Sequence, residues 1–474
     1  MNNHIRSTSA TKRFAFAAIL FTALGLKSTV KAQQIAPFKT GDRIAFVGNS
    51  ITDGGHYHSY IWLYYMTHFP NQRMTCYNVG IGGDDINQIA ARIDADAIAR
   101  KPTVLTLTWG MNDTGYFEWY RSDAQDFIDK RLVNSYKTYA DLEQKLKKQT
   151  GIRKILIGGS PYDETTKFTK KNIYPHKGEA LAKVIAHQQE SARKNGWDFV
   201  DFFHPMDAIN KREQLKDSTF SLTPSDRIHP DNNGHLVMAY IFLKTQGLSN
   251  KVVADVNINA SNKKVLKAAN CTVLNLVGSA KSLSFNYLSK SLPYPLDTIP
   301  RGWGNIKKQS DALKVVPFND EFNREMLTVK NLSNGRYDLL IDGERMGSWS
   351  ATEFSNGINL AEITTTPQYQ QAIQIRELNE ERWEIERRLR NYMWMEYDLL
   401  KGKGLLYKDN NAAMDTVKKY ALKDIFVNGN KDNYTRARYK NVRDAWQKQM
   451  DVLTDQIYAI NKPQTHRIQI VASK

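Results

Sequence analysis

Five short apolar runs between residues 43 and 247 constrain the fold of this chain more than any other feature. They are RIAFVG (43–48), MTCYNVG (74–80), TVLTLTWG (103–110), KILIGGS (154–160) and WDFVDFF (197–203). Runs of this length with little alternation are typical of strands buried on both faces, and stretches with helical spacing separate them. The alternation predicts a three-layer α/β/α sandwich in which helices cover both faces of a five-stranded parallel sheet.

The pattern changes after residue 250. The runs LTVKNL (327–332), RYDLLIDG (336–343) and SWSATEFSNGINL (348–360) predict short antiparallel strands and hence a small β domain over 251–365. Two apolar stripes beyond it predict a pair of antiparallel helices, a hairpin-like arm over 366–474. The final HRIQIVAS (466–473) alternates like a strand that returns to the β domain.

The start of the chain has the features of a secretory signal peptide over 1–32. Arg6, Lys12 and Arg13 precede the apolar stretch 14–26, and VKA (30–32) offers small residues for cleavage. No later run is long enough for a membrane span. We therefore expect a periplasmic or secreted protein without a membrane span, whose first folded domain covers 33–250.

The chain is basic, with a formal charge of +17. Five of the cations belong to the predicted signal peptide, which has no acidic residue, so the mature chain would carry +12. Many cations beyond residue 370 alternate with Glu and Asp, as on solvated helix faces, and no compact basic block indicates a nucleic-acid partner. Cys76 and Cys271 are expected to be two free, buried thiols rather than a disulfide, and no metal site can rest on them.

Polar residues and glycines stand where the predicted strands end. GNSITDGG (48–55) follows the first strand, NVGIGG (78–83) the second and GMND (110–113) the third, while DRIHPDNNGH (226–235) follows the fifth. Because the carboxyl ends of parallel strands meet at one sheet edge, these four segments are expected to lie together. The serine of the first segment can be a helix cap, a nucleophile or both.

The residue types in these four segments suit nucleophilic catalysis. Ser50 needs a base, His229 can take its proton, and Asp226 can hold the imidazole in one tautomer. The oxyanion formed on attack needs donors, which the backbone N–H groups of Ser50 and Gly80 and the side-chain amide of Asn112 can supply. Each such donor is typically worth ~3–4 kcal/mol of transition-state stabilisation.

In order and spacing, the four segments resemble the motif blocks of the SGNH hydrolases, also called the GDSL esterase/lipase family. The resemblance covers about residues 43–247 and implies a serine esterase with Ser50, Asp226 and His229 as its triad, and with Ser50, Gly80 and Asn112 as oxyanion donors. It implies an acyl-serine mechanism without metal or cofactor. The chain departs from the family at Asn49, where Asp is usual.

Members of this family act on acyl lipids, thioesters and acetylated or otherwise esterified sugars. The predicted export, the polar loops and the appended β domain resemble secreted bacterial carbohydrate esterases, so the expected partner is an acylated carbohydrate. The expected reaction is removal of O-acetyl or other small acyl groups from polysaccharide. A lipid esterase and a non-catalytic carbohydrate-binding protein remain the alternatives. The sugar, the linkage and the oligomeric state stay open.

Three other features near these segments have competing interpretations. GIGGDD (80–85) could suggest a dinucleotide loop, but the third glycine position is Asp85 and the motif follows the second strand. His56, His58 and His235 could suggest a metal site, but their spacing favours roles at the surface or at a helix N-terminus. The aromatic residues around GMND fit a buried core and a sugar-stacking surface equally well. They are Trp109, Tyr116, Phe117, Trp119 and Tyr120.

Overall fold

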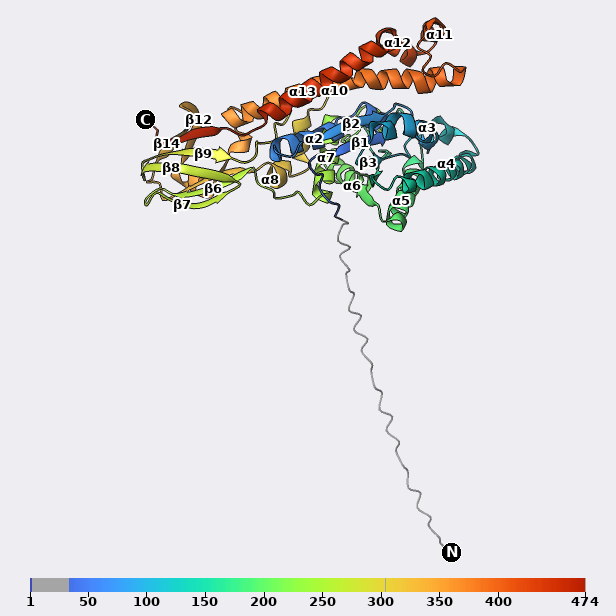
Figure 1. Cartoon of the computed structure of the whole chain (residues 1–474). Coiled ribbons are helices and arrows are strands. Elements are labelled where there is room, and N and C mark those ends of the chain that lie inside the picture. The colour runs from blue at the N-terminus through green and yellow to red at the C-terminus, as the bar shows by residue number, and fades with distance from the viewer. Residues whose placement is uncertain (2–33, 303, 474) are drawn as a thin grey trace. The chain divides into compact units, whose positions relative to one another are not determined.

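The computed structural model describes Met1 and residues 34–302 and 304–473, so the predicted signal peptide lies outside the described residues. The predicted parallel sheet is confirmed (Figure 1). It has the strand order β2-β1-β3-β4-β5. The strands are β1 (Arg43–Gly48), β2 (Thr75–Gly80), β3 (Val104–Leu107), β4 (Arg153–Gly158) and β5 (Asp198–Asp201).

The helices of this region fall into two groups. Helix α2 (Tyr57–His68) packs on α7 (Asn232–Thr245), and both contact β1 through the ring of Phe46. Helices α3 (Ile86–Arg92), α4 (Ala124–Lys148) and α5 (Lys177–Asn195) form the second group, and a hydrogen bond joins Tyr139 of α4 to Ser191 of α5. Helix α6 (Phe203–Gln214) follows β5 and was not predicted.

Two further sheets lie beyond residue 250 and share one hydrophobic core. The first has the order β13-β10-β6-β7 and the second the order β12-β11-β14-β9-β8. Their strands are β6 (Ala254–Asn259), β7 (Lys264–Ala269), β8 (Cys271–Ser279), β9 (Ser282–Ser289), β10 (Glu325–Lys330), β11 (Arg336–Ile341), β12 (Glu344–Ser350), β13 (Ile358–Asn359) and β14 (Thr465–Ala472).

Two details of this β region differ from the prediction. Strand β10 pairs with β6 in parallel, so the strands are not all antiparallel. The segment 348–360 is not continuous strand, because helix α9 (Ala351–Asn356) interrupts it. Ser350 and Glu353 form a capping box there, which satisfies the free N–H groups at the start of the helix. The predicted return strand is confirmed as β14, which lies between β9 and β11.

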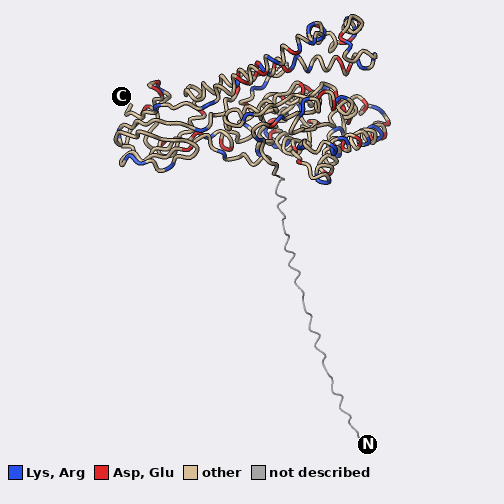
Figure 2. The backbone as a smooth tube through the Cα atoms, in the orientation of Figure 1, with Lys and Arg blue, Asp and Glu red and all other residues tan. Residues whose placement is uncertain are grey.

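The helical arm is built on α10 (Pro367–Trp394) and α13 (Lys440–Ile460), with α11 (Asn411–Ala421) and α12 (Ile425–Ala437) between them. The two long helices run antiparallel, as predicted. Near one end the side chain of Gln371 donates to the carbonyl of Ile460 at 2.7 Å, and toward the other Arg388 lies over the ring of Trp446. Acidic and basic residues alternate along both helices (Figure 2).

Only some of the charged residues of α10 form the solvated face that the sequence predicts: Glu381, Glu384 and Arg388 are exposed, but five others are buried. Arg376, Glu380, Arg382, Glu386 and Arg390 are each at most 9% exposed. They are buried because α10 covers the outer side of α2, a helix whose residues are all buried. The sequence of α2 therefore has no polar stripe. Residues 34–474 form one compact unit, and the domain boundaries near 250 and 365 remain predictions.

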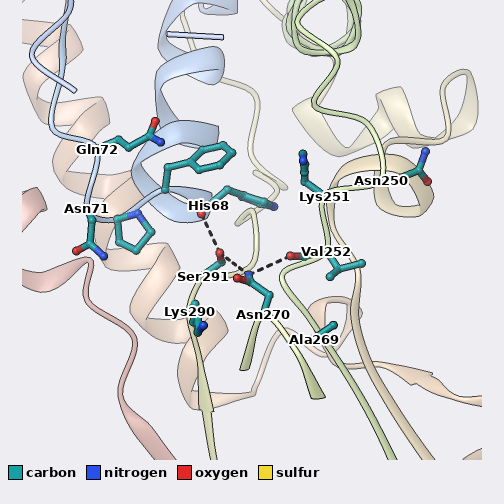
Figure 3. Close-up of a pocket in the computed structure, with 12 residues that line it drawn as sticks. His68, Asn71, Gln72, Asn250, Lys251, Val252, Ala269, Asn270, Lys290 and Ser291 are labelled. Carbon is teal, nitrogen blue, oxygen red and sulfur yellow. Dashed lines mark hydrogen bonds between the residues drawn. The ribbon is translucent and has the colours of Figure 1, made fainter. Parts of the chain in front are cut away.

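Hydrogen bonds also join the β region to the end of α2 (Figure 3). Ser291 donates to the carbonyl of His68 at 2.8 Å, and Asn270 donates to Ser291 and to the carbonyl of Val252. A pocket of about 530 Å³ lies at this junction, and no triad residue lines it. Both cysteines are free and buried, as predicted. No helix in the described part of the chain is long and apolar enough to cross a membrane.

Candidate active site

Ser50 is the first residue of the short helix α1 (Ser50–Asp53), directly after β1. The cap of this helix is Asn49 rather than Ser50, because the side-chain oxygen of Asn49 accepts from the N–H of Ile51 at 3.0 Å. Asn49 is buried, so this bond is shielded from water. The capping interpretation of Ser50 is therefore wrong, and its hydroxyl is left for another partner.

That partner is His229. Its Nε2 lies 2.8 Å from Oγ of Ser50, and its Nδ1 lies 2.6 Å from Oδ2 of Asp226. With Nδ1–H donating to the carboxylate, the lone pair of Nε2 faces the serine hydroxyl. The other carboxylate oxygen of Asp226 accepts from the backbone N–H groups of Ile228 and His229, both at 2.9 Å. The three predicted triad residues thus form one chain of hydrogen bonds.

The environment of Asp226 keeps it charged. Burial alone would raise the pKa of its carboxyl, but the hydrogen bonds and charge of His229 and the two backbone donors hold that pKa below its usual range. A charged Asp226 keeps the proton of the imidazole on Nδ1. The serine can then give its own proton to Nε2.

Arg227 fixes the loop that carries Asp226 and His229, a role that sequence reasoning missed. Its backbone has φ of +72°, in the left-handed region, and its side chain is 1% exposed. The guanidinium donates to the carbonyls of Asp163, Thr169 and Lys171. Such a buried anchor can compensate the backbone strain next to the triad.

Two of the predicted oxyanion donors are free to act. The backbone N–H of Ser50 has no acceptor among the described residues. The side-chain nitrogen of Asn112 donates one hydrogen to the carbonyl of Asp84 at 2.7 Å, and its oxygen accepts from the hydroxyl of Tyr116 at 2.5 Å. These bonds fix the orientation of the amide and leave its second hydrogen for a ligand.

The third predicted donor, Gly80, is already occupied. Its N–H donates to the side chain of Asn78 at 2.9 Å, and a Cβ at this position would lie 2.3 Å from the backbone nitrogen of Asp53. Gly80 is therefore needed for close packing of two turns. Gly83 is the better candidate donor of this loop, since its N–H has no acceptor within the described part of the chain and its φ is +88°. The neighbouring N–H of Gly82 donates to Asp53 at 3.0 Å.

Asp53 joins the nucleophile turn (48–55) to the glycine loop (78–83), because its carboxylate accepts the N–H of Gly82. Burial raises the pKa of Asp53, against the opposing charges of Arg390 and Arg387. A Cβ on Gly82 would lie 4.0 Å from Cβ of Ser50, which places the glycine loop beside the nucleophile.

Helix α10 supports the nucleophile turn through contacts with Gly55 and His56. The ring of Trp383 stacks on His56 at 4.0 Å between centroids, and its Nε1 donates to the carbonyl of Gly55 at 3.3 Å. Glu380 lies 3.1 Å from Nε2 of His56. These contacts could not be predicted from the sequence, because more than 320 residues separate the partners.

The same helix holds the glycine loop. Arg390 is fully buried and donates to the carbonyl of Gly80 at 2.9 Å and to both carboxylate oxygens of Asp96. Glu386 accepts from the backbone N–H of Asn78 at 2.9 Å. The two turns that surround Ser50 are thus fixed by buried charged side chains of the helical arm.

The triad opens into a pocket of about 530 Å³. Its lining combines the nucleophile turn and the Asp226–His229 loop with four residues from the second half of the chain. These four are Gly304, Asn305, Arg387 and Phe426. His235 also lines it and is 3% exposed.

The remaining predicted features have structural explanations. Among the described residues, no three His, Cys, Asp or Glu side chains could hold a metal ion. His58 lies against the carbonyl of Thr52 at 3.2 Å, and burial lowers its pKa to about 4. The aromatic residues near Asn112 divide: Trp109 and Trp119 are buried, whereas Phe117 and Tyr120 are 71% and 59% exposed.

A serine, histidine and aspartate in hydrogen-bonded sequence, at the carboxyl edge of a parallel sheet and beside free N–H donors, are the parts of a serine-dependent acyl hydrolase. Residues 46–237 match the GDSL-like Lipase/Acylhydrolase family, and residues 373–462 match the Diltiazem deacetylase C-terminal helical domain. The chain belongs to the GDSL-like lipase/acylhydrolase family and is a carboxylic ester hydrolase.

Two proteins of known description are similar to this chain. A solved structure described as a gut microbial diltiazem-metabolizing enzyme has 46% sequence identity and a TM-score of 0.90, and the match covers 93% of this chain and all of that one. An acetylxylan esterase from Geobacillus stearothermophilus is 26% identical over 224 residues, which are 44% of this chain and 95% of the esterase. The first similarity includes the C-terminal half, and the second does not extend over the whole chain.

Proposed function

We propose that this protein removes O-acetyl or other small acyl groups from polysaccharide, with Ser50 as nucleophile. The observation that carries the proposal is the unbroken chain of short hydrogen bonds from Ser50 through His229 to Asp226. One relative is an acetylxylan esterase, which supports a sugar ester as the substrate. The exposed aromatic rings of Phe117 and Tyr120, close in sequence to Asn112, are suited to stacking on sugars.

The geometry supports a two-step acyl transfer. His229 takes the proton of Ser50 as the hydroxyl oxygen attacks the ester carbonyl, and the backbone N–H of Ser50, the amide of Asn112 and the N–H of Gly83 stabilise the oxyanion. His229 then gives the proton to the departing alcohol, and the acyl group stays on Ser50. In the second step His229 activates a water molecule that releases the acid and restores the serine.

Two comparisons of rates test the proposal. Ser50→Ala should lose the hydrolysis of 4-nitrophenyl acetate that the unaltered protein performs, and equal rates would leave only a binding protein on a hydrolase fold. A screen of acetylated polysaccharides with acetate detection, set against lipid esters with long acyl chains, then tests the substrate class. Faster release from the lipid esters would favour the lipid esterase.

A small drug-like ester is a second candidate substrate. The observation that favours it is the 46% identity with the diltiazem-metabolizing enzyme over nearly the whole chain. Deacetylation of diltiazem, compared at equal concentration with acetylated xylan, distinguishes the two candidates.

We also propose that the protein is exported. The cations, apolar stretch and small-residue site within residues 1–32 support this. N-terminal sequencing of protein recovered outside the cytoplasm should begin at Gln33, and a retained Met1 would contradict the proposal.

A further inference from the structure

The active-site pocket receives two side chains from the helical arm, Arg387 of α10 and Phe426 of α12. Both lie more than 330 residues from Ser50 in the sequence, and neither takes part in the hydrogen bonds of the triad. Their presence in the pocket needs an explanation, since an acetyl group alone would fill only a small part of its volume of about 530 Å³.

Arg387 is placed to bind oxygen atoms of a ligand. Its guanidinium lies 5.6 Å from the ring centroid of Trp383, which supports it from one side. No described residue accepts a hydrogen bond from it or forms a salt bridge with it, although the residue is half-buried. Its neighbours on the same helix differ, because Arg382 and Arg390 both pair with buried carboxylates. A guanidinium offers five N–H donors in one plane.

Phe426 presents an aromatic ring at the same pocket. It is 68% exposed, yet its backbone is fixed at the start of α12, where the side chain of Asp424 accepts from the N–H groups of Phe426 and Val427. An exposed ring on a fixed backbone is a suitable surface for the flat face of another ring. The neighbouring Ile425 is 79% exposed and does not line the pocket.

The mechanism indicates which part of the substrate reaches these residues. His229 must give its proton to the departing oxygen, so the alcohol part of the ester lies on the His229 side of Ser50. Arg387 and Phe426 line the same pocket as His229, together with Pro230 and Asn305. A sugar ring would place its apolar face on Phe426 and its oxygen atoms toward Arg387 and Asn305.

We infer that Arg387 and Phe426 form a sugar-binding subsite, contributed by the helical arm, for the alcohol part of the ester. This inference rests on the proposed function, because it takes the ester to be that of a sugar. It assigns the arm a direct role in substrate selection, beyond its support of the turns around Ser50.

The test compares two acetyl esters by the same assay of acetate release, monoacetylated xylotetraose and ethyl acetate. Ethyl acetate has no ring for the subsite to bind. Phe426→Ala and Arg387→Gln should each lower the ratio of kcat/KM for the sugar ester to that for ethyl acetate by about tenfold or more, mainly through KM. Ile425→Ala is the matched control and should leave the ratio unchanged.

The outcomes separate this inference from the proposed function. If the unaltered protein deacetylates the sugar ester but Phe426→Ala and Arg387→Gln behave like Ile425→Ala, the subsite is refuted and the proposed function stands. If the unaltered protein hydrolyses ethyl acetate and no acetylated sugar, the proposed sugar substrate fails and the subsite fails with it. A circular-dichroism melting curve for each variant shows that a change in the ratio does not come from unfolding.

Discussion

The hydroxyl of Ser50 bonds to His229 because Asn49 takes the position of helix cap. The usual Asp of the family and this Asn can both accept the N–H of Ile51, so the departure at Asn49 does not disturb the turn. Arg227 and Gly83 lie in the two neighbouring loops of the site, and both have a backbone in the left-handed region.

The first prediction concerns Asp226. Asp226→Asn should lower kcat by about 10³-fold or more, because an amide nitrogen facing Nδ1 favours the wrong imidazole tautomer. The oxygen that accepts the N–H groups of Ile228 and His229 can be kept, so the loop should remain folded. Steady-state kinetics measures the change, and a loss smaller than tenfold would contradict the role assigned to Asp226.

The second prediction concerns the oxyanion donors. Asn112→Ala should lower kcat by about 10²–10³-fold with little change in KM, since the donor acts on the charge that develops in the transition state. Tyr116→Phe is the comparison, because it removes the hydroxyl that orients Asn112 and leaves the donor in place. If Tyr116→Phe lowered kcat as much as Asn112→Ala, the role of Asn112 would be structural, and its role as an oxyanion donor would be refuted.

The parallel sheet was predictable because buried strands have a simple apolar signature. The observed strands lie within the predicted runs or begin one residue earlier. The site residues followed from the same strand ends. Gly83 was missed in favour of Gly80, because two glycines in one loop differ only in their hydrogen bonds. Helix α9 was missed because its capping box lies inside a strand-like stretch.

The charges of α10 show why the contacts of this helix with the active site could not be predicted. Alternating Glu and Arg usually indicate a solvated face, but five of these side chains are buried, and Glu386 and Arg390 bind partners far away in the sequence. Arg390→Met should lower the free energy of unfolding by about 3–5 kcal/mol, because it leaves Asp96 with less compensation in a buried site. Chemical denaturation measures the difference. Lys440→Ala, in the exposed pair with Asp444, should change nothing measurable.

The burial of Glu325, at the start of β10, predicts that the free energy of unfolding depends on pH. Burial raises its pKa to about 7, despite hydrogen bonds from Tyr287 and Gln368. The folded state then binds more protons than the unfolded state between the ordinary pKa of a glutamate and about 7, so stability falls as pH rises through this window. Glu325→Gln should match the unaltered protein at pH ~5 and exceed it by about 2 kcal/mol at pH ~8.

Denaturation at the two pH values, with urea and with both proteins in parallel, measures this effect. A pH dependence of equal slope in the two proteins would show that Glu325 is ionised in the folded state without cost.

The helical arm is part of the active-site structure. Trp383 and Arg390 are buried against the turns that surround Ser50, and β14 returns the chain into the second β sheet. A chain that ends at residue 250 should therefore lose hydrolysis of ethyl acetate and of acetylated xylotetraose together. Retention of either activity, measured as acetate release from purified truncated protein, would show that the α/β region works alone.

We propose that Ser50 carries the acyl group between the two steps of the reaction. The direct measurement is peptide mapping by mass spectrometry after the protein has been mixed with 4-nitrophenyl acetate and quenched in acid during turnover. We expect one acetyl group, found on the peptide that contains Ser50 and absent from the same peptide of Ser50→Ala. Turnover by Ser50→Ala at the unaltered rate, or an acetyl group that accumulates during turnover on another residue, would contradict it.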